Sequence, residues 1–574
     1  MIEKNIDIKI NNKKFSAHEG QTIAEAAKAN NIYIPLLCSH PDLKIKPNCR
    51  VCSVEIRGQK TLRPACSTKI TEGMEIFTHS PLAKKARKIN LELLFAQHRE
   101  ECSDCVWRFN CQLLNLAEEN DAKITRFHDR KTDYPIYRFS NAVEFDSTKC
   151  IDCRNCVEVC KNQGVGYLEV YERGAFMKVM PTKKKNIDCV YCGQCIMHCP
   201  AGAFEGVGEF EDIEKPLSDP DKIVIAQFAP AIRASIGEEF GLDYGEIVTN
   251  QIVSALKKLG FDKVFDTSVG ADFTTYEESK EVIERMKSGK RLPLLTSCCP
   301  SWVKYIEFFY PEFISNLTTV RSPQEILGGL IKTYYAKKEK IDPKKIFVVS
   351  IMPCVAKKYE IARSQLKING MPSVDFVLTT REFARLLKHR GIDFNTLRPQ
   401  KLDDLFGSPS GAGIIYGATG GVMESAFRTT YETLTGKRLD KIDFKQVRGL
   451  KHIKKAAIEI CGETKKIAVV NGLGYAKELI EEIQRNPKDN YTCIEVMACP
   501  GGCIGGGGQP LPTNDDIRLA RANGLYKIDK TTKIRRAHEN PIVKKVYAEF
   551  LDKHPKLAHE ILHTSYRKQK REKN

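Results

Sequence analysis

The most reactive feature of this sequence is its set of 22 cysteines, which are unevenly distributed along 574 residues. Fifteen lie between Cys38 and Cys199, and the other seven are scattered over the rest of the chain. The N-terminal residues contain no apolar signal-peptide segment, which predicts a cytoplasmic protein. In a reducing compartment, clustered cysteines are more often metal ligands than disulfides. The pattern therefore predicts several metal centres in the first third of the chain.

Two runs of the form C-x2-C-x2-C-x3-C are the most specific pattern. In ferredoxins with two clusters, the fourth cysteine of each such run ligates the other cluster. One 4Fe-4S cluster is therefore expected on Cys150, Cys153, Cys156 and Cys199. The second is expected on Cys189, Cys192, Cys195 and Cys160. Lys161 stands where a proline usually follows the first run, which changes the turn but not the ligation.

Two groups upstream also have ligand spacing. The first is Cys38, Cys49, Cys52 and Cys66, after a segment that alternates like two strands (5–20) and a helical stretch (21–31). It predicts a 2Fe-2S ferredoxin-like site, with a four-cysteine zinc site as the alternative. The second is His98, Cys102, Cys105 and Cys111, which predicts a 4Fe-4S cluster with one histidine ligand. Because imidazole is neutral, it should raise the reduction potential of that cluster.

After residues 211–221, which read as a linker, short apolar strands alternate with helical stretches. Three strand-like segments end in cysteine, at Cys299, Cys354 and Cys499, and the last continues into a glycine-rich stretch that contains Cys503. Ligands of open α/β sheets lie beyond the carboxyl ends of the strands, so these four thiolates could hold one more 4Fe-4S cluster. The glycines indicate a backbone that approaches a bulky cofactor closely. Cys461 and Cys493 have no such pattern and are expected to be small core residues.

The motifs TSCCPSW, MPCVAKK and MACPGGCIGGGGQP resemble the three signature motifs of the iron-iron (FeFe) hydrogenases. The resemblance covers nearly the whole chain and implies a ferredoxin hydrogenase that catalyses 2H⁺ + 2e⁻ ⇌ H₂. It implies an H-cluster, in which Cys299, Cys354, Cys499 and Cys503 hold a 4Fe-4S cubane. Cys503 would also bridge to a two-iron subsite that carries carbonyl, cyanide and an azadithiolate. The adjacent Cys298 would be the proton donor, since a thiol holds its proton weakly.

The resemblance also implies a proton path from solvent through Arg285, Glu281, Thr318 and Glu278 to Cys298. Helical spacing places Glu278, Glu281 and Arg285 on one face, so a surface ion-pair ladder is the alternative. Threonine replaces the usual serine at position 318. The implied pocket of the two-iron subsite consists of Ala229, Pro230, Pro323, Gln324, Met352, Lys357, Tyr416 and Met497. Lys357 would donate to a cyanide, the neighbouring Lys358 is expected to be solvated, and Tyr416 replaces the usual phenylalanine.

The predicted fold is a multidomain α/β protein in four parts. A 2Fe-2S ferredoxin-like (β-grasp) domain covers 1–79. A 4Fe-4S domain, whose cluster has one histidine and three cysteine ligands, covers 80–140. A two-4Fe-4S ferredoxin domain covers 141–210. An α/β catalytic domain of two lobes covers 211–574.

The net charge of +18 would usually indicate a nucleic acid or a membrane surface as partner. Cluster thiolates offset part of it, because each four-cysteine cluster adds about −2. We therefore expect neither partner, but ferredoxin or flavodoxin as electron carrier, and maturation proteins that build the H-cluster. The basic C-terminal stretch is expected to be a solvated helix and tail, with a docking surface for an acidic redox partner as the alternative.

Two other classes of protein share parts of the pattern. A non-catalytic electron-transfer subunit, like the large iron-sulfur subunit of respiratory complex I, would lack Cys298, Cys354 and the CPGGC run. A hydrogen sensor typically carries an added signalling domain, and related iron-sulfur assembly factors lose the proton-path residues. The sequence favours the hydrogenase.

Overall fold

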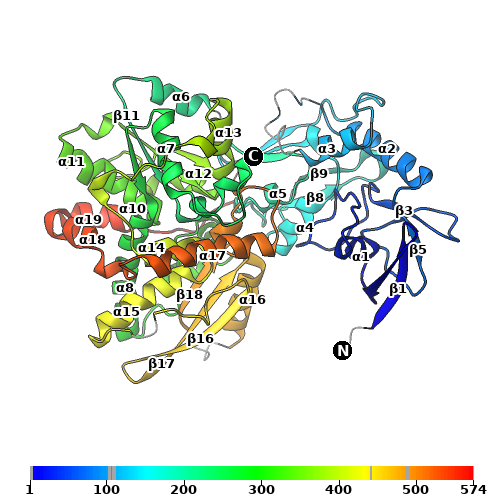
Figure 1. Ribbon diagram of the computed structural model, residues 1–574. Helices are drawn as coiled ribbons and strands as arrows, with labels where there is room; N and C mark the ends of the chain where they lie inside the picture. The colour runs from blue at the N-terminus through cyan, green and yellow to red at the C-terminus, as the bar shows by residue number, and fades with distance from the viewer. Residues whose placement is uncertain are drawn as a thin grey trace.

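The computed structural model describes residues 4–100, 102, 105, 111–208, 210–439, 442–486 and 491–572. The N-terminal modules form an arm beside a larger α/β part (Figure 1). Within the described residues, no helix is both long and apolar enough to span a membrane.

The N-terminal module is a five-stranded sheet with one covering helix. Its elements are β1 (Asn5–Ile10), β2 (Lys13–His18), α1 (Ile23–Ala29), β3 (Ser53–Ile56), β4 (Arg63–Pro64) and β5 (Glu75–Phe77). Alternation in β1 turns Ile6, Ile8 and Ile10 into the core, and a capping box of Thr22 and Glu25 starts α1. The predicted strand pair and helix are confirmed.

The two cysteine runs fold alike. Helices α4 (Asn155–Asn162) and α5 (Gln194–Met197) each start inside a run, directly after a residue with left-handed backbone. That residue is Arg154 (φ 64°) in the first run and Gly193 (φ 69°) in the second. The rest of this arm consists of α2 (Pro81–Phe95), α3 (Gln112–Glu119), β6 (Ile136–Phe139), β7 (Val143–Asp146), β8 (Leu168–Tyr171), β9 (Lys178–Pro181) and β10 (Phe204–Gly206).

The larger part contains two four-stranded sheets. One has the order β12-β11-β14-β15, is entirely parallel, and is made of β11 (Ile223–Phe228), β12 (Lys263–Asp266), β14 (Ile346–Met352) and β15 (Phe376–Thr379). The other has the order β13-β18-β17-β16 and is made of β13 (Leu294–Leu295), β16 (Ile453–Ile460), β17 (Glu463–Asn471) and β18 (Tyr491–Met497). The central strands β14 and β18 are almost entirely buried and mainly apolar, as expected for strands covered on both faces.

The helices that position the site pack between and around these sheets (Figure 1). They are α8 (Thr267–Ser288), α9 (Pro300–Phe309), α10 (Pro323–Leu330), α12 (Ala356–Ile361), α15 (Gly421–Thr435) and α17 (Asp515–Thr531). The long helix α8 contacts α10 and α15, and 15 of its 22 residues are buried. A helix that is buried on most faces can carry ionisable groups to the centre of the protein.

Three local predictions are wrong. The segment read as a linker contains helix α6 (Glu211–Ser218). Cys461 is exposed at the tight turn of the β16–β17 hairpin, whereas Cys493 is buried as predicted. Lys358 is not solvated: only 4% of it is exposed, and its ammonium group pairs with Glu382.

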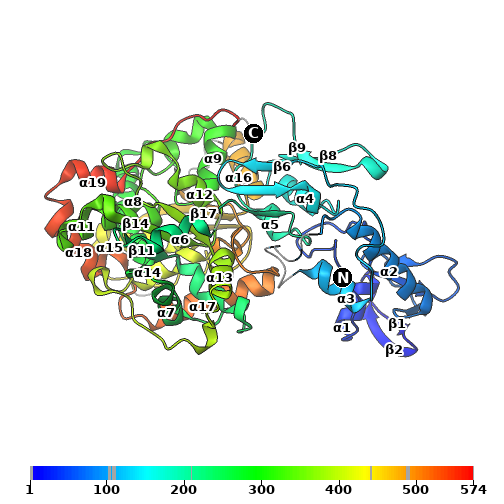
Figure 2. The ribbon, with the colours of Figure 1, turned by 90° about the horizontal axis from the view of Figure 1, so that it is seen from above.

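The predicted solvated tail is also wrong. The last helical elements are α18 (Pro541–Val546), a π-helical turn (Tyr547–Leu551) and α19 (Pro555–Leu562). After them the chain runs back to the arm that the N-terminal modules form (Figure 2). There Arg571 donates to the carbonyls of Thr182 (2.6 Å) and Lys184 (2.5 Å). Glu572 accepts from the buried Lys304 (2.8 Å). The tail therefore ties the two parts of the protein together.

Candidate active site

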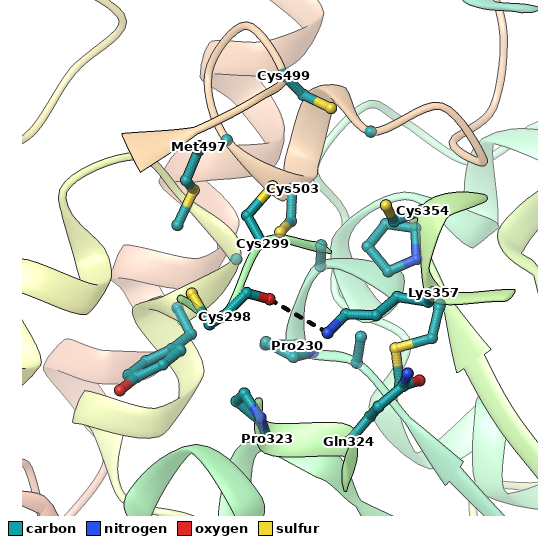
Figure 3. A pocket seen from close by; sticks show the side chains of 18 of the residues that line it. Pro230, Cys298, Cys299, Pro323, Gln324, Cys354, Lys357, Met497, Cys499 and Cys503 are labelled. Carbon is teal, nitrogen blue, oxygen red and sulfur yellow. Dashed lines mark hydrogen bonds between the residues drawn. The ribbon is translucent and has the colours of Figure 1, made fainter. Parts of the chain in front are cut away.

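A mainly apolar cavity lies where β14, β18 and the N-terminus of α9 meet. Five cysteines line it: Cys298, Cys299, Cys354, Cys499 and Cys503. Figure 3 shows the side chain of Cys298 turned away from the group that the other four form. Four thiols from three chain segments can hold one cubane, which leaves Cys298 free for another role.

All eight side chains predicted around the two-iron subsite line the same cavity. They are Ala229, Pro230, Pro323, Gln324, Met352, Lys357, Tyr416 and Met497. The lining also includes positions that the motifs did not single out, such as Thr267 and Gly417. The residues fit an H-cluster, because the walls are mainly apolar and the only charged side chain among these lining residues is a lysine, which suits an anionic ligand such as cyanide.

Lys357 is held by Glu360, a residue that the sequence reasoning missed. The Lys357 ammonium donates to Glu360 Oε2 (2.7 Å) and to the Cys298 carbonyl (3.2 Å). Gln324 Nε2 and Ser322 Oγ donate to the same carboxylate oxygen, at 2.7 and 2.9 Å. Burial acts to lower the pKa of Lys357, but Glu360 raises it, so the cation persists in an apolar wall. The i, i+3 spacing of the two residues on α12 could have indicated this pair.

The glycine-rich stretch after Cys499 packs against protein. A Cβ on Gly506 would lie 2.2 Å from the Pro353 carbonyl oxygen, and one on Gly507 would lie 2.7 Å from the Cα of Gly193. Gly193 belongs to the second cysteine run of the ferredoxin-like module. The glycines thus allow two cysteine-bearing loops to touch, and the predicted reason, close approach to a cofactor, does not account for these two positions.

The predicted proton-path residues lie close together in the interior. Glu278, Glu281 and Arg285 are all buried on α8, so the alternative of a surface ion-pair ladder is wrong. Thr318 Oγ1 donates to Glu281 Oε2 (2.7 Å), and Arg285 pairs with Glu281 Oε1. Neither carboxylate oxygen of Glu278 has a described partner at normal hydrogen-bond geometry, although the nearby Tyr416 hydroxyl acts to lower the pKa of this carboxyl.

Burial, together with the nearby charges of Glu281 and Glu495, raises the pKa of Glu278 to about 8. Burial and the charge of Glu278 also raise the pKa of the Cys298 thiol. Both groups therefore carry a proton at neutral pH. Tyr416 stands where phenylalanine was expected, and its additional hydroxyl hydrogen-bonds to Thr275 Oγ1 (2.9 Å) in the same region.

His98 is buried next to the ferredoxin-like clusters. Its Nδ1–H donates to the Lys149 carbonyl (2.8 Å), one residue before Cys150. This bond fixes the tautomer and leaves Nε2 as the atom that can ligate iron. Cys102 and Cys105 are half-buried, and Cys111 is buried.

His98→Cys is expected to keep a cluster but to lower its reduction potential by roughly 100 mV or more, because it adds a thiolate charge. A redox titration followed by electron paramagnetic resonance (EPR) measures the change, with the exposed His128→Gln as control. Infrared bands of the H-cluster should be unchanged. Their loss would mean that His98 is structural to the catalytic part.

The cysteine motifs and the fold are similar to those of known iron-sulfur enzymes. The chain matches the family model of the iron only hydrogenase large subunit, C-terminal domain, over residues 222–507, and that of the iron hydrogenase small subunit over 515–569. It also matches a 2Fe-2S iron-sulfur cluster binding domain over 3–81 and a 4Fe-4S dicluster domain over 149–203.

Two relatives match along nearly their whole length. The NADP-reducing hydrogenase subunit HndD of Solidesulfovibrio fructosivorans is 41% identical, over 99% of both chains. Iron hydrogenase 1 of Clostridium pasteurianum is 39% identical, over 97% of this chain and 99% of the relative. The solved apo FeFe-hydrogenase HydA1 of Chlamydomonas reinhardtii is 38% identical with a TM-score of 0.56, and covers 62% of this chain and 97% of its own. The chain belongs to the iron-only (FeFe) hydrogenase family.

Proposed function

We propose that this chain interconverts protons and hydrogen at an H-cluster held by Cys299, Cys354, Cys499 and Cys503. The observation that carries the proposal is the fifth cysteine of the cavity, Cys298, set apart from the other four. A purely electron-transferring protein has no use for a separate thiol in a closed cavity. When bound, the H-cluster supplies the irons at which protons and electrons combine.

The protein's own residues would supply the protons. The Cys298 thiol holds a proton beside the cavity. When Cys298 has given up this proton, Glu278 can supply another, because the pKa of its carboxyl lies at about 8. Glu281 and Thr318 continue the path away from the cavity. Lys357, oriented by Glu360, would hold the anionic side of the cofactor.

Contacts between cysteine-bearing loops support an electron path. Asn48 Nδ2 donates to the Cys153 carbonyl (3.0 Å), which places the first module beside the first cysteine run. The Cys499 Sγ lies 3.8 Å from the Cys192 carbonyl oxygen, which places the second run beside the cavity. We propose that electrons pass from the domains at 1–79 and 80–140 through the domain at 141–210 to the domain at 211–574.

The full set of cofactors in this proposal is one 2Fe-2S cluster, three 4Fe-4S clusters and the H-cluster. Anaerobically purified, matured protein is then expected to contain about 20 iron atoms per chain. Protein produced without maturation proteins should lack about two of them, together with the infrared bands of carbonyl and cyanide. Iron analysis with infrared spectroscopy tests this. A full iron content without those bands in matured protein would contradict the proposed H-cluster.

For the electron partner we propose ferredoxin or flavodoxin, in the cytoplasm. The relation to an NADP-reducing hydrogenase subunit supports a second candidate, in which other subunits exchange electrons between this chain and NADP(H). Hydrogen production by the purified chain with reduced ferredoxin, with reduced flavodoxin and with NADPH separates the two. Turnover with either carrier protein but not with NADPH is expected. Turnover only after addition of further subunits would favour the second candidate.

A further inference from the structure

The carboxylate of Glu281 has a second hydroxyl neighbour besides Thr318. Its Oε2 atom also accepts from the Thr319 backbone N–H (3.0 Å) and from Thr319 Oγ1 (3.3 Å). In the predicted path, Thr318 connects Glu281 with Glu278 and Cys298. Thr319 therefore offers a second hydrogen-bonded route from Glu281.

Arg285 is poorly suited to carry protons from solvent to Glu281. Only 1% of it is exposed, and its guanidinium donates to the carbonyls of Arg291, Asn316 and Leu317 at 2.8–2.9 Å as well as to Glu281. A guanidinium has five donors and no acceptor and does not lose its proton in proteins. In this structure Arg285 fixes the position of Glu281.

His563 lies at the other end of the Thr319 route. Its Nδ1 atom is 3.0 Å from Thr319 Oγ1, and its side chain is 22% exposed. Backbone bonds from Thr564 N to the Thr319 carbonyl and from Arg321 N to the Leu562 carbonyl, both 2.8 Å, hold the two segments in register. The imidazole is therefore fixed between solvent and the Thr319 hydroxyl.

We propose that His563 is the residue through which protons pass between solvent and Glu281. This inference rests on the proposed function. During hydrogen production, the His563 imidazolium gives its Nδ1 proton to Thr319 Oγ1, while the Thr319 hydroxyl proton moves to Glu281 Oε2. The hydroxyl gains one proton and loses one, and solvent reprotonates the imidazole. Hydrogen oxidation runs the same steps in reverse.

The charges around His563 suit this role. Glu277 Oε2 lies 3.4 Å from His563 Nε2, and the other carboxylate oxygen of Glu277 accepts from Tyr547 and Lys280. Burial acts to raise the pKa of Glu277, but hydrogen bonds from His563, Lys280 and Tyr547 lower it to about 2. This carboxylate thus stays ionised beside the His563 ring.

Three cations or potential cations oppose the Glu277 carboxylate. They are Lys280, which pairs with Glu277, His559, whose ring centroid lies 5.0 Å from that of His563, and Arg321, which donates to the His563 carbonyl (2.9 Å). The His563 ring therefore lies between charges of both signs.

The test is His563→Gln in matured protein, with hydrogen production from reduced methyl viologen measured between about pH 6 and about pH 9. Glutamine can still bond to Thr319 but does not titrate, so turnover is expected to fall at least about tenfold and to lose part of its pH dependence. Thr319→Val, which removes only the relay hydroxyl, should give the same loss. Iron content, infrared bands and the EPR signals of the accessory clusters should match those of the parent. His128→Gln, a change at an exposed histidine of the N-terminal arm, should keep the parent rate.

Imidazole added to His563→Ala should restore part of its turnover, which a structural role would not explain. His563→Gln at the parent rate and with the parent pH profile would overturn the inference. So would loss of the infrared bands, which would make His563 a structural residue. A matured parent protein without hydrogen turnover would instead overturn the proposed function itself, so the two failures are distinguishable.

Discussion

Cys298→Ser is expected to keep full iron content and normal carbonyl and cyanide bands, yet to lose turnover in both directions by about 10²-fold or more. Serine fills the same space, but its hydroxyl holds a proton far more firmly than a thiol does. Cys298 lines the same cavity as the other four cysteines, but its side chain is turned away from them. Infrared spectroscopy with hydrogen production and hydrogen oxidation assays measures both halves of the expectation.

Two further substitutions complete the comparison. Cys299→Ser removes a soft thiolate from the proposed cubane, so it should lose iron and the H-cluster bands. Cys461→Ser changes an exposed cysteine of the β16–β17 turn and should alter neither iron nor rate. If the Cys298→Ser variant turns over at the parent rate, the assignment of Cys298 as proton donor is contradicted.

What the sequence predicted well is what local spacing determines. The two cysteine runs fold alike because each places a left-handed residue before a short helix. The α/β texture predicted buried strands, and the cavity lies beyond the carboxyl ends of β14 and β18. Residues from seven separate segments meet there because the fold joins them, and only the family resemblance could group them before the structure.

What the sequence could not predict depends on contacts between distant segments. Lys358 looks like any solvated lysine until Glu382 and the Val207 carbonyl are placed beside it. The basic tail looks free until Lys304, itself fully buried, is seen to pair with Glu572. His563 lies 244 positions from Thr319, and no periodicity connects them. Such pairs follow from tertiary packing, which local patterns do not encode.

Glu278→Gln is expected to lose hydrogen turnover by about 10²-fold or more, because the amide cannot pass a proton between Glu281 and Cys298. The same change is expected to stabilise the protein near pH 8. The pKa of the Glu278 carboxyl rises from 4.5 to about 8 in the fold, first through burial and then through Glu281 and Glu495. Between these two values the native state holds a proton that the unfolded state lacks, so the free energy of unfolding falls as pH rises through this window.

Glutamine has no such proton, so the stability advantage of the variant should grow from about pH 5 to about pH 8, to the order of 3 kcal/mol. Apparent melting temperatures of matured protein at these two pH values, at one scan rate, measure it. The exposed Glu284→Gln on the same helix is the matched control and should change neither rate nor melting temperature. If the variant keeps the parent's rate, Glu278 is not part of the proton path. If its melting temperature depends on pH as that of the parent does, the raised pKa of Glu278 is refuted. A buried carboxyl that weakens the fold suits a proton path through an apolar interior, since only a carboxyl that is costly to ionise gives up and regains its proton near neutral pH.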